Sequence, residues 1–136
     1  MFVIPTLFAS ADWTTDYKAA LVQAKQQNKS VLLDFTGSDW CGYCKLLDKE
    51  VFPDASFKEF TGKNFISVTV DFPRSTKLPD ALAQQNDQLQ QQFKVDGFPT
   101  LIVVSAEGKE LGRMEGYNPG SGPKPVIEQL QGYIKK

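Results

Sequence analysis

The sequence predicts an α/β fold: a mixed central sheet of about four strands with helices on both faces. Three observations lead to this prediction. The run 31–35 is short and densely apolar, which is typical of a strand buried on both faces. A helical stretch separates it from a second apolar run, 64–72, in the strand–helix–strand order of a parallel unit. Glu107-Gly108 then divides two further apolar runs at the spacing of a hairpin.

The first half of the chain is expected to form helix 12–28, strand 30–35, helix 40–51, helix 55–61 and strand 64–72. The first helix is predicted because apolar residues from Trp13 to Ala24 recur three and four positions apart. Asp16 and the threonines before it can cap its start. The helix that opens at Trp40-Cys41 is expected to end near Val51, because Pro53 follows.

The second half is expected to form helix 80–93, strand 100–105, strand 109–115 and helix 126–134. Asp80 is a good cap for the first of these helices, and Leu89 and Phe93 lie on its apolar face. Its many glutamines are expected to form a solvated face. Two segments are predicted as loops: 73–79, which carries Arg74 and Lys77, and the Gly- and Pro-rich 116–125.

Composition sets limits on the function. A length of 136 residues with 41% apolar and 23% charged residues is typical of one globular domain. Lys and Arg total 15 against 16 Asp and Glu, so no nucleic-acid partner is expected. No apolar run approaches the roughly 18–20 residues of a membrane span, so none is predicted. The chain has no histidine, which excludes His-based catalysis and His-ligated metals.

The first residues suggest where the protein works. Residues 1–11 are apolar and end in Ala9-Ser10-Ala11, which resembles the end of a secretory signal. They are interpreted as a signal-peptide remnant or as an apolar arm, and 12–136 as the folded domain. The signal interpretation predicts a periplasmic or secreted protein in an oxidising compartment. The alternative, an apolar arm on a native start, leaves a cytoplasmic location open.

The two cysteines, Cys41 and Cys44, carry the predicted chemistry. They follow a buried strand and open a helix, whose first turn has free N–H groups and the positive end of the dipole. A thiolate at Cys41 is stabilised there, while Cys44 lies one turn deeper. This arrangement is typical of thiol–disulfide exchange, with Cys41 attacking and Cys44 resolving. Two alternatives remain: a purely structural pair, or half of a metal site. Zinc needs four ligands in a structural site, so no metal is expected.

Three segments together resemble the thioredoxin superfamily: Val31-Leu32-Leu33-Asp34-Phe35, Trp40-Cys41-Gly42-Tyr43-Cys44-Lys45 and Val95-Asp96-Gly97-Phe98-Pro99-Thr100. The resemblance covers about residues 13–135 and is nearest to the bacterial thioredoxin-like, disulfide-isomerase-like branch. It implies a thioredoxin-like fold and a protein disulfide oxidoreductase or isomerase that needs no cofactor. Protein or peptide disulfides would be the substrates, with an unidentified electron donor. We expect a monomer.

The resemblance also implies roles for individual residues. Pro99 matches a proline that follows a cis peptide bond beside the dithiol, and the Phe98 backbone would pair with an extended substrate. Asp34 matches a buried acid that takes and returns the proton of Cys44. The substrate-binding residues would be Trp40, Gly42, Tyr43, Phe98 and Pro99. The alternatives are an ordinary turn proline, a structural aspartate and an indole that serves packing.

The direction of exchange depends on the residues between the cysteines. Gly42-Tyr43 lacks a histidine that could stabilise a thiolate strongly, so a reductase or isomerase is favoured over a strong oxidase. Two other classes stay open. A non-catalytic thioredoxin-like module would use its groove to hold a peptide, and a thiolate carrier would use both sulfurs to bind a metal.

Overall fold

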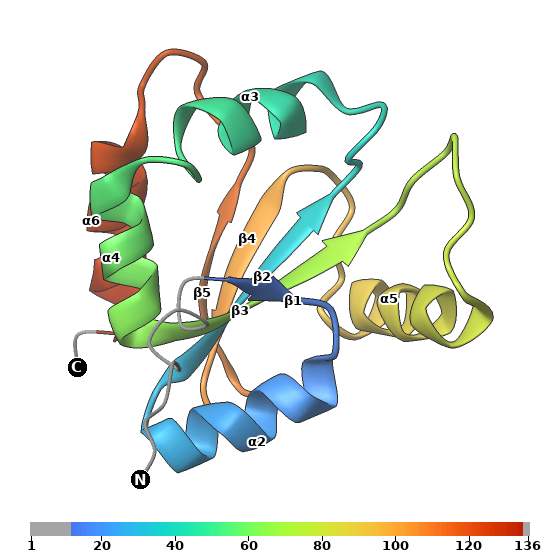
Figure 1. Ribbon diagram of the computed structural model, residues 1–136, viewed down its shortest axis with the longest axis horizontal. Coiled ribbons are helices and arrows are strands. Elements are labelled where there is room, and N and C mark those ends of the chain that lie inside the picture. Colours follow the sequence, from blue (N-terminus) through green and yellow to red (C-terminus); the bar gives the residue numbers. More distant parts are fainter. Residues whose placement is uncertain (1–11, 135–136) are drawn as a thin grey trace, which may run out of the picture.

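A computed structural model describes residues 12–134 of the chain (Figure 1). The interpretation of residues 1–11 as a signal remnant or arm falls outside these residues. The elements, in chain order, are β1 Trp13–Thr14, α2 Tyr17–Gln27, β2 Ser30–Thr36, α3 Gly42–Glu50, α4 Ala55–Asn64, β3 Phe65–Asp71, α5 Asp80–Gln92, β4 Thr100–Val104, β5 Glu110–Glu115 and α6 Pro123–Ile134.

The strands form one mixed sheet of five strands in the order β1-β3-β2-β4-β5. Strands β1, β3 and β2 are parallel, and β4 and β5 continue the sheet as an antiparallel hairpin. The predicted mixed sheet is therefore confirmed, with one strand more than expected. The chain passes from β2 through α3 and α4 to β3, which is the crossover that a parallel pair requires.

The additional strand corrects the predicted start of the first helix. Trp13 and Thr14 pair with Ser67 and Val68 at the edge of the sheet, and the helix begins at Tyr17. Asp16 is its N-cap, and its carboxylate accepts a hydrogen bond from the backbone N–H of Ala19 at 3.1 Å. A two-residue strand has no alternation to detect, and its backbone bonds depend on a partner more than fifty positions away.

Helices cover both faces of the sheet, as predicted (Figure 1). Helices α2 and α5 pack on one face, and α3, α4 and α6 on the other. Side chains of β2 alternate between the two cores: Val31, Leu33 and Phe35 face α2 and α5, and Leu32 faces the other layer. Because alternate residues of a strand share a face, Asp34 lies on the same side of the sheet as Leu32.

Two details of the helices differ from expectation. Gln85 of the glutamine-rich α5 is not merely solvated: its side chain accepts a hydrogen bond from the Tyr17 backbone and donates one to the Thr15 backbone, so it ties α5 to the start of α2. Helix α6 begins at Pro123 rather than at residue 126. Proline suits the first helical position because its missing N–H would have no partner there.

The register brings four loops to one edge of the sheet. Thr36 at the carboxyl end of β2 pairs with Asp71 at the end of the parallel β3. Phe35 pairs with Thr100 at the start of the antiparallel β4. The loops after β2 and β3 and the loop before β4 therefore meet at this edge. The loop after β5 joins them, because the Gly116 N–H donates to the Pro99 carbonyl at 2.8 Å.

Candidate active site

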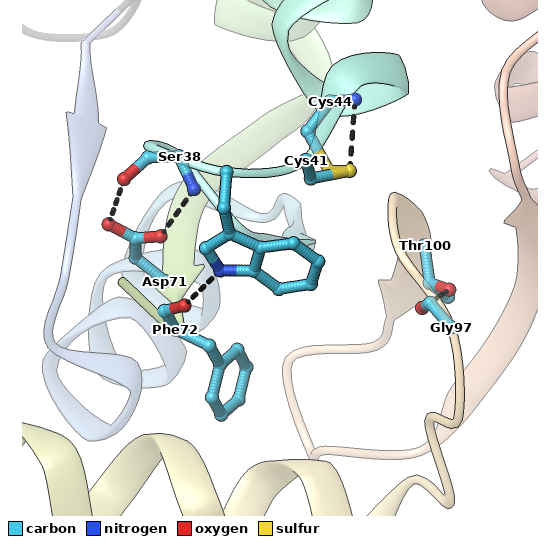
Figure 2. Close-up of a disulfide and its surroundings, with 8 residues drawn as sticks. Ser38, Cys41, Cys44, Asp71, Phe72, Gly97 and Thr100 are labelled. Carbon is cyan, nitrogen blue, oxygen red and sulfur yellow. Dashed lines mark hydrogen bonds between the residues drawn. A yellow bond between two sulfur atoms is a disulfide. The ribbon is translucent and has the colours of Figure 1, made fainter. Parts of the chain in front are cut away.

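A disulfide links Cys41 and Cys44 at the start of α3, with their Cα atoms 5.2 Å apart (Figure 2). Cys41 is the N-cap, one position before the first helical residue, and Gly42 opens the helix. The Cys41 Sγ accepts a hydrogen bond from the Cys44 N–H at 3.2 Å. The predicted position of the dithiol at a helix N-terminus is confirmed. In the reduced protein, the same Cys44 N–H would stabilise the Cys41 thiolate, because it has no acceptor within the helix.

The two cysteines differ in exposure. Cys41 is 7% exposed and Cys44 is 1% exposed, while Gly42 and Tyr43 between them are open to solvent, Tyr43 by 56%. Tyr43 is thus a large apolar ring that stands out beside the disulfide. A second protein can reach Cys41 more readily than Cys44.

The segment before β4 lies in the surroundings of the disulfide (Figure 2). The peptide bond Phe98-Pro99 is cis, as predicted. Thr100 fixes the turn by donating its hydroxyl hydrogen to the Gly97 carbonyl at 2.8 Å. The ring of Phe98 packs edge-on against the indole of Trp40, with ring centres 5.8 Å apart. The structure therefore joins Trp40 and Phe98, which lie 58 positions apart in the chain.

The indole of Trp40 is held from several directions. Its Nε1–H donates to the Phe72 carbonyl at 2.7 Å (Figure 2). Gly37 lies so close beneath the ring that a Cβ at this position would overlap it. The guanidinium of Arg74 stacks on the ring, 3.6 Å from its centre. Trp40 thus has a packing role, and it also borders the dithiol through its neighbour Cys41.

Two carboxylates fasten the loop before Cys41 to the loop after β3. Asp71 accepts hydrogen bonds from the N–H and the hydroxyl of Ser38 at 2.9 and 2.6 Å (Figure 2). Asp39 accepts from the backbone N–H groups of Arg74 and Ser75 at 3.0 and 2.8 Å. These backbone bonds lower the pKa of Asp39 below its ordinary value. The main chain that carries Cys41 is therefore braced against β3.

Asp34 is buried beneath this edge, 3% exposed. Within residues 12–134, its Oδ1 has no hydrogen-bond partner. Burial raises the pKa of Asp34 well above its ordinary value, and the nearby carboxylates of Asp48 and Asp71 raise it further. A carboxyl group with a raised pKa can donate and accept a proton closer to neutral pH than an ordinary one.

A cavity of about 430 Å³ reaches Asp34 from the side of α3 and α4. It is lined by polar groups, Asp34, Thr36 and Asp48 among them, and by aromatic rings, including Phe52 and Phe57. The hydroxyl of Thr36 also lacks a partner within the described residues. The cavity therefore places the buried carboxyl beside both polar groups and aromatic rings.

Sequence reasoning missed several of these residues. Asp48 lies four positions after Cys44, so helical spacing alone puts both on one face of α3 and could have marked it. Burial, followed by the charge of Asp71, raises the pKa of Asp48. Asp39 and Asp71 carried no local signal. Arg74 was noted as a loop cation, but its place on Trp40 was not predicted.

Two features of the described residues bear on a membrane span and on a metal site. Over residues 12–134, no helix combines the length and apolar character needed to cross a bilayer. The same part of the chain holds no group of three or more His, Cys, Asp or Glu residues arranged to bind a metal ion.

A family model described as a thioredoxin-like domain matches residues 17–131. The chain belongs to this thioredoxin-like family. One curated relative, Disulfide bond reductase DsbH of Chlamydia pneumoniae, is 42% identical over 118 residues, which cover 87% of this chain and 70% of the reductase. Thioredoxin-related protein DsbJ of the same organism is 30% identical; the match covers 88% of this chain but 36% of DsbJ.

Solved structures agree with this thioredoxin-like assignment. A structure titled DsbH Oxidoreductase matches with a TM-score of 0.83 and 37% identity, covering 99% of this chain and 92% of that chain. A thioredoxin from Thermus thermophilus matches with a TM-score of 0.67 and 22% identity, covering 93% of this chain and 89% of that one. The second match shows the shared fold, and the predicted thioredoxin-like fold is confirmed.

Proposed function

We propose that this chain is a thiol–disulfide oxidoreductase that reduces or isomerises protein disulfides through the Cys41-Gly42-Tyr43-Cys44 dithiol. The observation that carries the proposal is the disulfide at the N-terminus of α3, with one partner more exposed than the other. The reducing direction is favoured for two reasons. The dipeptide between the cysteines has no histidine, and the relative with 42% identity is named a disulfide bond reductase.

The proposed reaction is a two-electron exchange. In the reduced protein, the Cys41 thiolate attacks one sulfur of a substrate disulfide, forms a mixed disulfide and releases the first substrate thiolate. Cys44 then loses its proton and attacks the Cys41 sulfur, which closes the disulfide and releases the second substrate thiolate. A dithiol donor must afterwards return two electrons to the protein. In isomerisation, the released substrate thiolate instead attacks a second disulfide of the same substrate and frees a different substrate thiolate. That thiolate attacks the substrate sulfur of the mixed disulfide, the Cys41 thiolate leaves, and no donor is needed.

Trp40, Gly42, Tyr43, Phe98 and Pro99 are proposed to form the substrate surface. Exposure of Gly42 and Tyr43 supports this role, because a substrate must approach the disulfide over them. The packing of Phe98 against Trp40 makes one surface of the two segments. An extended polypeptide could bind the Phe98 backbone by strand addition.

Asp34 is proposed as the group that takes the proton of Cys44 during resolution. Its burial, its unpartnered oxygen and its raised pKa support this role. The cavity that reaches it, lined in part by the polar side chains of Thr36 and Asp48, offers a route by which the proton leaves.

We further propose that the folded domain, 12–136, acts as a monomer in an oxidising extracytoplasmic compartment, periplasmic in a bacterium. The apolar segment before Asp12, which ends in small residues, supports the location. Fractionation of cells and light scattering of the purified protein test the two statements. Recovery in the cytoplasm, or a stable dimer in solution, would contradict them.

The proposed function is tested by reduction of insulin, with dithiothreitol as the final reductant. The wild-type protein should accelerate release of the insulin chains, and Cys41→Ser should abolish the acceleration. Pre-reduced Cys44→Ser, mixed with insulin in the absence of dithiothreitol, should instead accumulate a mixed disulfide between Cys41 and an insulin chain, visible by mass spectrometry. Peptide binding without reduction by the wild-type protein would identify a non-catalytic binding module and overturn the proposal.

A further inference from the structure

The positively charged side chain of Arg74 is held against Trp40, the residue that precedes Cys41. The guanidinium of Arg74 stacks on the indole of Trp40 at 3.6 Å from the ring centre, and Trp40 directly precedes Cys41. Arg74 itself is exposed. The register of β2 against β3 sets the position of Arg74. Because Thr36 pairs with Asp71, the loop after β3 lies beside the loop after β2.

The guanidinium is positioned in advance of any ligand. Asp39 clamps the backbone of Arg74 and Ser75 through two hydrogen bonds. The indole beneath the guanidinium is fixed by its bond to the Phe72 carbonyl and by Phe98 at its edge. An arginine that is stacked on a fixed ring loses less side-chain freedom when it binds a ligand than a free one does.

The hydrogen-bonding groups of Arg74 are available. Among residues 12–134, its guanidinium makes no ion pair and donates no hydrogen bond to protein. The carboxylates that join the loops after β2 and β3 already accept other hydrogen bonds: Asp39 from backbone N–H groups, and Asp71 from Ser38. A guanidinium stacked on one face keeps the N–H groups of its edge free, and these match the two oxygens of a carboxylate.

We propose that Arg74 is a specificity-determining residue that binds the side-chain carboxylate of an Asp or Glu flanking the substrate cysteine. This inference rests on the proposed function and adds the substrate class, namely protein disulfides with acidic neighbours. Because Trp40 and Cys41 are adjacent, the carboxylate would lie within a few residues of the attacked cysteine, at about 3.3 Å per extended residue. The exposed Lys77 in the same loop adds a second positive charge but has no stacking partner within the described residues.

The test measures single-turnover reduction of synthetic peptide disulfides by the pre-reduced protein. Three peptides differ at the position next to cysteine, which is Glu, Gln or Lys. The wild-type protein should reduce the Glu peptide about fivefold faster than the Gln peptide at low salt, the upper range for an exposed ion pair. The Lys peptide should be slowest, and added salt should shrink the Glu-to-Gln ratio. A wild-type ratio of one would overturn the proposal.

Three variants test whether Arg74 causes the preference for the Glu peptide over the Gln peptide. Arg74→Gln should bring the Glu-to-Gln ratio to about one, and Arg74→Lys should restore part of it, because an ammonium makes no paired contact. Lys77→Gln is the matched control and should keep most of the wild-type ratio. A ratio that survives in Arg74→Gln, even if all rates fall together, would show that Arg74 acts on the dithiol or on folding and not on the substrate.

Failure of the proposed function is recognised separately. Bis(2-hydroxyethyl) disulfide is small and uncharged, so its reduction by the wild-type protein reports the dithiol chemistry without the carboxylate. Reduction of this compound with a Glu-to-Gln ratio of one would refute the role of Arg74 and leave the oxidoreductase standing. No reduction of this compound or of the peptides would refute both.

Discussion

At the scale of single residues, Cys41 and Cys44 differ through their places on one helix. Cys41 caps α3, where its sulfur faces a backbone N–H, and Cys44 lies within the first turn and is almost fully buried. A helix N-terminus stabilises an anion, so the pKa of the reduced Cys41 is expected below that of a free thiol.

We therefore predict that Cys41 is alkylated first in the reduced protein. Brief treatment with iodoacetamide near neutral pH, followed by peptide mapping, should find the label predominantly on Cys41. The fully unfolded protein is the control, because both cysteines should then react at similar rates. Preferential labelling of Cys44 in the folded protein would reverse the two assignments.

Asp34→Asn is predicted to slow resolution of the mixed disulfide more than its formation. Formation needs the Cys41 thiolate, which the helix terminus stabilises, whereas resolution needs Cys44 to lose a proton in a buried site. A general base typically contributes about 10²–10⁴-fold, and we expect the low end. Stopped-flow kinetics that follow attack and resolution separately make the measurement. Equal resolution rates for the wild-type protein and Asp34→Asn would mean that Asp34 has only a structural role.

The same substitution is predicted to stabilise the oxidised protein at neutral pH. Burial raises the pKa of Asp34 in the folded state, so the folded protein holds this proton more tightly than the unfolded chain. Stability is then lost as the pH rises above the unfolded value of about 3.9. Asn carries no charge and avoids this loss.

Thermal unfolding at two pH values checks this linkage. Asp34→Asn should melt above wild type at pH 7.5, and the difference should narrow toward about pH 4. Asp87→Asn, at an exposed position of α5, is the matched control. A lower melting temperature for Asp34→Asn at pH 7.5 that returns toward the wild-type value at lower pH would mean that the folded protein stabilises the carboxylate, and it would contradict the prediction.

At the scale of elements, the loop between β2 and α3 positions the dithiol by contacts with other loops. Ser38 and Asp39 bind the end of β3 and the chain that follows it, and Trp40 bonds to the Phe72 carbonyl. At the other end of α3, Glu50 accepts hydrogen bonds from the loop after β5, through the Tyr117 hydroxyl at 2.6 Å and the Gly120 N–H at 2.9 Å. Helix α3 is thus held at both ends.

Gly37→Ala is predicted to disturb this loop. The added methyl would overlap the indole of Trp40, which cannot move without losing its bond to Phe72. Overpacking of this kind costs typically about 1–3 kcal/mol. Urea unfolding should show the loss, and tryptophan fluorescence should report a changed indole environment. Gly42→Ala is the control, because a Cβ at this position meets no atom within 4 Å. Equal stability of the two variants would contradict the packing inferred for Trp40.

At the scale of the whole molecule, the predicted chemistry lies at one edge of the sheet, and helices cover both of its faces. Each face of the sheet is covered by helices over its own apolar core. The edge where β2 and β3 end and β4 begins carries the disulfide, the Phe98-Pro99 segment and the Arg74–Trp40 stack. A substrate protein would meet all three together.

The redox potential is a property of the whole molecule, because it compares the stability of the oxidised folded protein with that of the reduced folded protein. We predict a potential of roughly −270 to −180 mV, between thioredoxin and disulfide isomerase. The reason is the Gly42-Tyr43 dipeptide, which offers no histidine to stabilise a thiolate strongly. Equilibration with glutathione buffers, with the oxidised fraction followed by mass spectrometry, makes the measurement. A value near about −120 mV would indicate a strong oxidase.

The sequence by itself determined the fold class, nine of whose ten elements rest on local patterns, and the position of the dithiol. A dense apolar run predicts β2, and a Cys pair directly after it predicts the helix N-terminus. These two features depend on neighbours within a few positions, which is the range over which hydrophobic period acts. The cis bond before Pro99, which the structure has, was implied by the resemblance of this segment to the thioredoxin superfamily.

Only the tertiary structure decided which other residues surround the dithiol. The edge strand β1, the stack of Arg74 on Trp40 and the carboxylates around Asp34 all join residues distant in the chain. Strand β1 depends on its pairing with β3, and the other two features depend on the register of β2 against β3, which places Thr36 beside Asp71. That register is set by the summed burial of two cores, so the pattern of any single segment does not contain it.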